Sequence, residues 1–145
     1  MDMIYGISNA VVSLLPKQSV VAEQVKEVML SNAPGTNFVR LAGISGALAV
    51  GMAAIGAHVI HAKSKNTELK QVFDTGNSMH LLHSVALLTV PLTRRPNLTG
   101  YLLTTGMLLF SGTCYYHALT DDKRLRIFTP YGGMFLILGW IIIAA

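Results

Sequence analysis

The chain has few charged residues, and acids are the scarcest of them. Only 12% of its 145 residues are charged, with seven Asp and Glu against eleven Lys and Arg, whereas a soluble domain is roughly one quarter charged. Hydrophobic residues make up 52%. The net charge of +4 therefore arises from missing acids, and no basic cluster with interleaved aromatics occurs. This composition is typical of an integral membrane protein and argues against nucleic-acid binding.

Residues that carry chemistry are also scarce. The single cysteine, Cys114, excludes an internal disulfide and any CxxC motif. It lies in an apolar run, where a free cysteine usually behaves as a small hydrophobe. No Ser/His/Asp set and no pair of catalytic carboxylates can be recognised, and no strand precedes Gly132-Gly133 as a phosphate loop would require. We therefore predict a non-enzymatic protein with no cofactor.

Long runs without any charged residue dominate the rest of the chain. Four such runs cover residues 41–62, 75–93, 96–120 and 127–145. Each is about as long as the roughly 20 residues that span a bilayer, and the short charged connections force neighbouring helices to run antiparallel. The sequence predicts an all-α integral membrane protein, a four-transmembrane-helix antiparallel bundle over residues 38–145, with helices near 39–62, 72–92, 97–118 and 129–145.

The predicted helix boundaries have local support. Pro96 and Pro130 can each occupy a first helical turn, where a missing N–H costs nothing, and Thr129 would then cap the fourth helix. The second helix is the least apolar, since it contains His80 and His83, and the amphipathic spacing before residue 72 allows it to begin earlier.

The first predicted span is rich in small residues. Gly43, Ala47 and Gly51 recur every four positions, and small residues let helices approach closely inside lipid. We favour packing within the bundle as their role. The alternative is that this face docks on another protein.

Residues 1–37 are predicted to form a separate extension that is partly an amphipathic helix. Val21, Val25 and Val28 fall on one helical face, which suits a helix lying on a membrane or on a partner. The segment contains acids and no Arg, unlike a cleaved transit peptide.

The chain has five histidines, and the four-span topology places all of them toward one side. We call this side B; it holds the connections at residues 63–74 and 121–126. We expect His58, His80 and His83 to lie near one another there, hydrogen-bonded at the membrane interface, with Tyr116 in an aromatic belt. The alternatives are ligands to a metal or haem, or contacts to a quinone or a proton relay.

Several segments resemble a known family, the transmembrane protein 256 family, also called the domain-of-unknown-function 423 family. The similar segments are Gly56-Ala57-His58, His80 to Leu88, Phe110-Ser111-Gly112 with Tyr115-Tyr116, and Thr129-Pro130-Tyr131-Gly132-Gly133 followed by Gly139-Trp140. The resemblance implies a four-helix membrane fold with His58, His80 and His83 at motif positions, whereas His61 and His117 match no motif. The family has no established reaction, so the resemblance implies nothing about activity.

These observations together predict a function without catalysis. We expect an accessory or assembly subunit of a larger, respiratory-type membrane complex, with the lipid bilayer and other membrane proteins as partners, in the mitochondrial inner membrane. The alternatives are a histidine-based redox, haem or quinone-binding protein and, last, a small oligomeric transporter, because none of the predicted spans contains an acid.

Overall fold

The computed structural model describes residues 34–62 and 65–145, and these are almost entirely helical. The main helices are α3 (Thr36–Ile55), α4 (Thr67–Leu87), α5 (Pro96–Thr120) and α6 (Thr129–Ala144). A π-helical segment, η1 (Gly56–His61), continues α3, while the 3-10 segments η2 (Val90–Leu92) and η3 (Arg124–Phe128) join α4 to α5 and α5 to α6. The amphipathic helix predicted before residue 34 lies outside the described residues.

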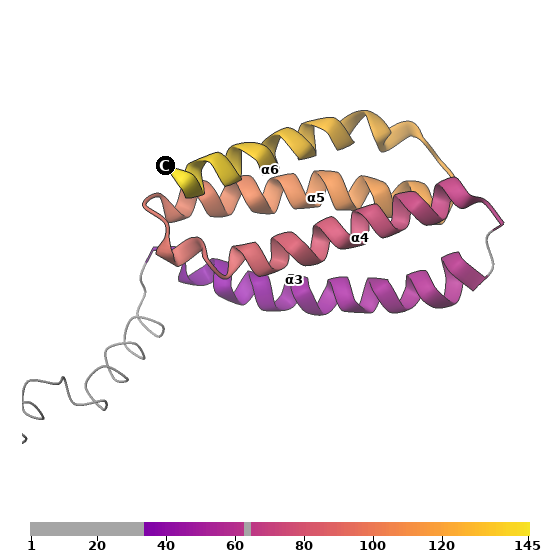
Figure 1. The fold of residues 1–145 in the computed structure, drawn as a ribbon, viewed down its shortest axis with the longest axis horizontal. Coiled ribbons are helices and arrows are strands. Elements are labelled where there is room, and N and C mark those ends of the chain that lie inside the picture. The colour runs from indigo at the N-terminus through magenta and orange to yellow at the C-terminus, as the bar shows by residue number, and fades with distance from the viewer. Residues whose placement is uncertain (1–33, 63–64) are drawn as a thin grey trace, which may run out of the picture. The chain divides into compact units, whose positions relative to one another are not determined.

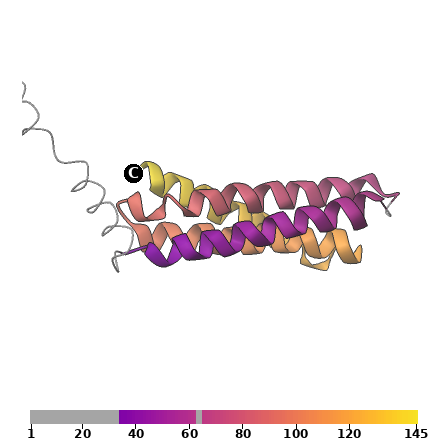
Figure 2. The same ribbon diagram turned by 90° about the horizontal axis from the view of Figure 1, so that it is seen from below.

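The four helices lie side by side, and consecutive helices run in opposite directions (Figure 1). α3 packs against α4, and α5 packs against both α4 and α6. The view in Figure 2 shows α3 and α4 adjacent along their lengths. α5 therefore sits at the centre of the packing, which explains why it has more buried residues than the helices on either side.

Helix α4 begins at Thr67 rather than at residue 72 and ends at Leu87 rather than at residue 92. The Asn66 side chain accepts a hydrogen bond from the Glu68 backbone N–H at 2.9 Å, as an N-cap does. The added first turn also buries Leu69 against the bundle. At the other end, Pro91 falls in η2, which is consistent with the loss of a backbone donor there.

The glycines that bring helices together belong to α5 and α6, not to α3. A Cβ added at Gly132 would lie 2.5 Å from the Phe110 backbone nitrogen, and one added at Gly139 would lie 2.7 Å from a Leu103 methyl group. α5 and α6 can approach this closely only because these positions lack a side chain.

Gly43 and Gly51, by contrast, are exposed, and an added Cβ would meet nothing within 4 Å at either position. Ala47, between them, is also exposed. The buried face of α3 consists instead of Phe38, Ala42, Ser45 and Ala49. The prediction that Gly43 and Gly51 pack within the bundle is therefore wrong. A different face of α3 turns inward.

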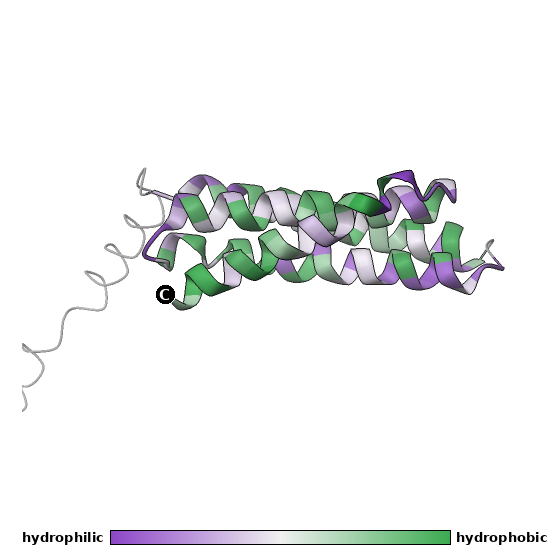
Figure 3. Cartoon of the chain, turned by 90° about the horizontal axis from the view of Figure 1, so that it is seen from above, coloured by the Kyte–Doolittle hydropathy of each residue, from purple (hydrophilic) through white to green (hydrophobic). Residues whose placement is uncertain are grey.

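Many large hydrophobic side chains are exposed, and hydrophobic residues recur along the helices (Figure 3). They occur on all four helices and include Ile44, Leu48, Leu81, Leu82, Val85, Leu108, Ile137, Leu138 and Ile141. Soluble monomers rarely expose apolar surface of this extent. Two helical stretches, Thr36–His61 and Arg124–Ala144, are long and apolar enough to cross a bilayer by length and composition. The all-helical prediction is confirmed, while two of the four predicted spans meet this criterion.

Candidate functional site

His80 lies at the centre of a chain of polar side chains inside the bundle. Its Nδ1 is 3.0 Å from the Tyr115 hydroxyl, and its Nε2 is 3.0 Å from Ser45 Oγ. Tyr115 donates its own proton to Asn77 Oδ1 at 2.9 Å, so its oxygen accepts from His80 Nδ1–H. In a neutral imidazole Nε2 is then an acceptor, and it accepts a hydrogen bond from the Ser45 hydroxyl.

The chain continues from Ser45 to Ser84, whose hydroxyl oxygens are 2.6 Å apart. Ser84 also lies within reach of the His80 carbonyl oxygen, at 2.8 Å, and Met107 Sδ offers Ser45 a weaker acceptor at 3.5 Å. We call these linked side chains the His80 chain; they are Ser45, Asn77, His80, Ser84 and Tyr115. Burial of polar groups is tolerated only when they are hydrogen-bonded, and the His80 chain meets this condition while tying α3, α4 and α5 together.

His83 is buried at the contact between α4 and α6. The Trp140 indole N–H donates to its Nε2 at 3.1 Å, and its Nδ1 is 2.8 Å from the Met79 carbonyl oxygen. Because an indole nitrogen can only donate, Nε2 is the acceptor and Nδ1–H donates to the carbonyl. Both ring nitrogens therefore have partners, and His83 is held as a neutral tautomer.

The predicted cluster of His58, His80 and His83 does not form as one group. His80 turns toward α3 and α5, whereas His83 turns toward α6, since residues three apart on a helix point in directions about 60° apart. His58 is exposed on η1, outside both contacts. The neighbouring His61 bonds Asp74 Oδ1 at 2.9 Å on the surface.

The other family-motif positions have separate structural roles. Tyr116 donates to Asp122 Oδ2 at 3.1 Å, and the hydrogen bond from the Arg124 backbone N–H to that carboxyl holds the Asp122 pKa below its usual range. The hydroxyl oxygens of Thr129 and Thr113 are 2.7 Å apart. Thr129 is thus the first residue of α6 and bonds α5, instead of capping the helix as predicted.

The two glycines of the same motif differ in their surroundings. Gly132 is buried against the backbone of α5, while an added Cβ at Gly133 would make only an ordinary contact, at 3.8 Å, with the Phe110 ring. Gly132 therefore sets the distance between α5 and α6, and Gly133 does not.

A cavity of about 340 Å³ lies at side B, where residues of α4, α5, η3 and the first residue of α6 line it. We call it the side B groove. It is lined by Glu68, Gln71, Val72, Thr75, Phe110, Thr113, Cys114, His117, Arg126 and Thr129. His117 is only 2% exposed, yet its Nε2 has no hydrogen-bond partner among the described residues.

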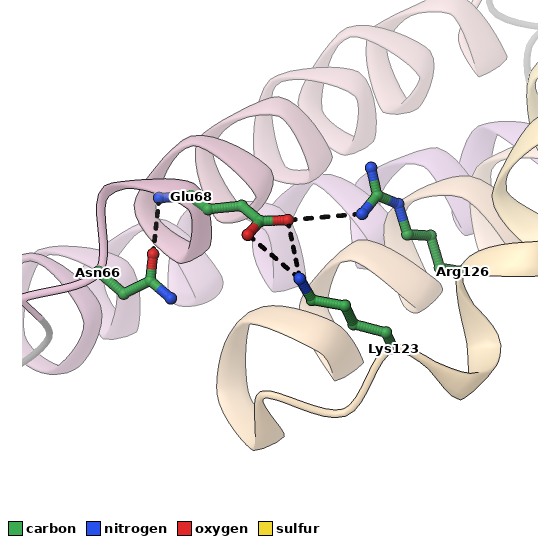
Figure 4. A network of polar contacts seen from close by, with 4 residues as sticks. All are labelled: Asn66, Glu68, Lys123 and Arg126. Atoms are coloured by element: carbon green, nitrogen blue, oxygen red, sulfur yellow. Dashed lines mark hydrogen bonds and ion pairs between the residues drawn. The ribbon is translucent and has the colours of Figure 1, made fainter.

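An ion-pair network joins Glu68 at the start of α4 to Lys123 and Arg126 (Figure 4), and Glu68 and Arg126 also line the side B groove. Lys123 Nζ lies 3.2 Å from both oxygens of Glu68, and an Arg126 guanidinium nitrogen lies 3.4 Å from one of them. The hydrogen bond and the charge of Lys123 hold the Glu68 pKa below its usual range. η3 thereby stays against the start of α4.

Sequence reasoning missed three of these positions as parts of a site. Ser45 and Ser84 are small polar residues in apolar runs, and Asn77 lies near the start of such a run. A usable signal existed for Ser45, which lies three and four residues from the apolar Ala42 and Ala49 on one helical face. A serine on an apolar face needs a partner from a neighbouring helix.

An apolar outer surface around a hydrogen-bonded polar interior defines a helical membrane protein. The sequence model of the family described as "Protein of unknown function (DUF423)" matches residues 52–133. The chain belongs to this family, as the resemblance in its motifs predicted.

Curated relatives support the same assignment. UPF0382 membrane protein YwdK of Bacillus subtilis is 36% identical over 73% of this chain and 91% of its own length. UPF0382 membrane protein SERP0230 of Staphylococcus epidermidis is 31% identical over 73% and 90%. UPF0382 membrane protein C1782.12c of Schizosaccharomyces pombe is 32% identical over 69% and 92%. No solved structure matches the chain. Membrane location follows from the names of these relatives and from the apolar surface.

Proposed function

We propose that the protein crosses the membrane four times and serves as a non-catalytic accessory subunit that docks on other membrane proteins through the outer face of α3. The observation that carries this proposal is the exposed row of Gly43, Ala47 and Gly51, which no part of the described chain covers. Lipid provides no hydrophobic drive for helix association, so close van der Waals packing at small residues is the available source of affinity.

The packing of α4 and α5 supports the proposal of four crossings. These helices lie alongside α3 and α6, the two that are apolar enough to span by composition. On α4, His80 and Ser84 turn inward and bond Ser45, while Leu81 and Val85 on α4 and Leu108 on α5 turn outward. A helix whose polar groups are satisfied internally can be accommodated in hydrocarbon.

Cysteine labelling tests the number of crossings. In a Cys114→Ser background, Asn66→Cys and Asp122→Cys should react with an impermeant maleimide from the same side of a sealed vesicle, and Arg94→Cys only from the other side. Reaction of residues 66 and 122 from opposite sides would contradict four crossings.

Docking through α3 is tested by Gly51→Leu. The substitution should leave folding intact, because an added side chain meets open space, and should remove co-migrating proteins on native gels after mild extraction. Gly112→Leu is the matched control, since Gly112 on α5 is also exposed with open space around it. Mass spectrometry of the co-migrating band then identifies the partner or a second copy of this chain. Migration of the unaltered protein alone, or equal partner loss in both variants, counts against the docking face.

We further propose the mitochondrial inner membrane as the location and a respiratory-type complex as the assembly. Relatives in bacteria and in a yeast support a membrane type that both groups of organisms possess, and energy-transducing membranes meet that condition. Fractionation should recover the protein in carbonate-resistant mitochondrial membranes that resist protease until the outer membrane is opened. Recovery in another membrane would contradict the mitochondrial location and the respiratory-type complex, but not the four crossings or the docking face of α3.

A histidine-based haem protein is the second candidate, and the geometry disfavours it for His80 and His83. All four of their ring nitrogens have hydrogen-bond partners, so an iron ligand would have to replace one of these bonds. A visible spectrum of purified protein provides the check, since a Soret band lost in His80→Ala would favour haem binding over the subunit role.

A further inference from the structure

The side B groove contains a buried histidine with a ring nitrogen that has no partner. His117 lines the groove from α5, and its Nε2 has no hydrogen bond within residues 34–62 and 65–145. By contrast, the buried His83 and the partly buried His80 and Tyr115 all have hydrogen-bond partners. Buried polar groups are nearly always satisfied by protein, water or ligand. Three buried side-chain atoms lack a partner among the described residues, on Thr104, Ser111 and His117. Of these residues His117 alone lines the groove, so it points to a molecule there.

The charges at the groove favour an anion. Glu68 contributes one negative charge, while Lys123 and Arg126 contribute two positive charges, so the network carries a net charge of +1. Arg126 has a half-exposed side chain and contacts Glu68 through one nitrogen at 3.4 Å. Most of its guanidinium donors thus remain available, and arginine suits phosphate because its fork of donors matches two oxygens.

The shape of the groove adds an apolar requirement. Phe110 and Val72 line it together with the polar groups, and about 340 Å³ is far more than a lone phosphate would fill. Its lining residues come from α4, α5, η3 and the first residue of α6, so the groove lies near the side B ends of these helices, at the interface of a membrane-spanning bundle. A lipid head group at the interface, with chains leading away from it, suits this position.

We propose that the side B groove binds the phosphate of an anionic phospholipid, with Arg126 and Lys123 at its mouth and His117 Nε2–H donating from its floor. Without ligand, Glu68 pairs with Lys123 and Arg126. With ligand, these two side chains bind both the phosphate and the Glu68 carboxylate. A lipid head group and a free phosphate share this chemistry, and the apolar lining favours the lipid.

Cys114 provides a built-in reporter, since it lines the groove and is the single cysteine of the chain. A small thiol reagent should modify Cys114 in maltoside micelles, which contain no phosphate. Short-chain phosphatidylglycerol should slow this reaction in a saturable manner, and phosphatidylcholine, which carries no net charge, should not. Inorganic phosphate should protect only weakly; protection as strong as that by the lipid would assign the site to free phosphate.

Arg126→Gln should weaken protection by phosphatidylglycerol about tenfold, as loss of one charge-assisted hydrogen bond predicts. Arg124→Gln is the matched control, because Arg124 is nearby and highly exposed but bonds Asp122 and does not line the groove. Native mass spectrometry of both full-length variants should show the co-purified lipid lost only from Arg126→Gln. The proposal would be overturned if the two variants had equal effects or if phosphatidylcholine protected as well as phosphatidylglycerol. It would also be overturned if neither phosphatidylglycerol nor inorganic phosphate protected Cys114.

Discussion

The His80 chain and the side B groove place histidines of the same bundle in opposite situations. His80 and His83 have a partner for every ring nitrogen, and each links its own helix to a neighbour. His117 is as buried as His83, yet its Nε2 has no partner among the described residues, and the residue lines a cavity. The difference between His117 and His83 is therefore one of hydrogen-bond satisfaction and not of burial.

The two regions also differ in how they hold the helices together. The His80 chain joins α3, α4 and α5 by short bonds between neutral groups in the interior. Exposed ion pairs next to the groove join the start of α4 to η3. Exposed ion pairs contribute little to stability, so the groove end should open at much lower cost than the His80 chain.

The largest expected effect is that of His80→Phe. The substitution removes two hydrogen bonds and leaves Ser45 and Tyr115 each one partner short, which should lower the free energy of unfolding by about 1–3 kcal/mol. His117→Phe should change it little, because its Nε2 makes no bond. Thermal unfolding in detergent, read by the folded fraction on size exclusion, measures both.

His58→Phe is the control for adding an aromatic ring at an exposed site on η1. If His117→Phe destabilises the protein as much as His80→Phe does, the distinction between the two regions fails.

A smaller effect is expected from Trp140→Phe. The substitution keeps an aromatic ring but leaves His83 Nε2 without its donor, which should cost about 1 kcal/mol. Combining it with His83→Leu should recover part of that loss, since two apolar groups leave nothing unsatisfied. A double-mutant cycle on unfolding midpoints gives the coupling. Strictly additive losses would show that the bond between Trp140 and His83 does not stabilise the α4–α6 contact.

The sequence predicted the helices well because their signals are local. Charge-free runs and the prolines at Pro96 and Pro130 placed α5 and α6 within about two residues of their bounds. The start of α4 was harder to predict, because its first turn is polar outside and apolar inside, and a search for charge-free runs overlooks such a turn.

The site was less predictable, because its roles depend on which face of each helix turns inward. Gly43 and Gly51 lie outside, while Ser45, two residues from Gly43, lies inside. His117 matched no motif, yet it is the groove residue with a ring nitrogen that has no hydrogen-bond partner among the described residues. Such differences come from helix rotation and tertiary packing, which a periodic small-residue pattern does not determine.

The smallest expected effect is a pH dependence at the mouth of the groove. The folded-state pKa of Glu68 lies below its ordinary value of 4.5 because Lys123 donates to the ionised carboxylate. A carboxyl with a depressed folded pKa stabilises the fold above its unfolded pKa and loses that contribution as pH falls through the folded value. The unfolding midpoint should therefore decline slightly more below pH 4.5 in the wild-type protein than in Glu68→Gln. Lys123→Gln, which removes the main donor, should flatten the same range, while Lys65→Gln should not, because Lys65 takes no part in the Glu68 ion pairs. Since the Glu68 carboxylate and its partners are solvent-exposed, salt should screen the effect. A difference that persists in high salt would assign the pH dependence to a buried group instead and would remove the contrast between an exposed groove mouth and a sealed His80 chain.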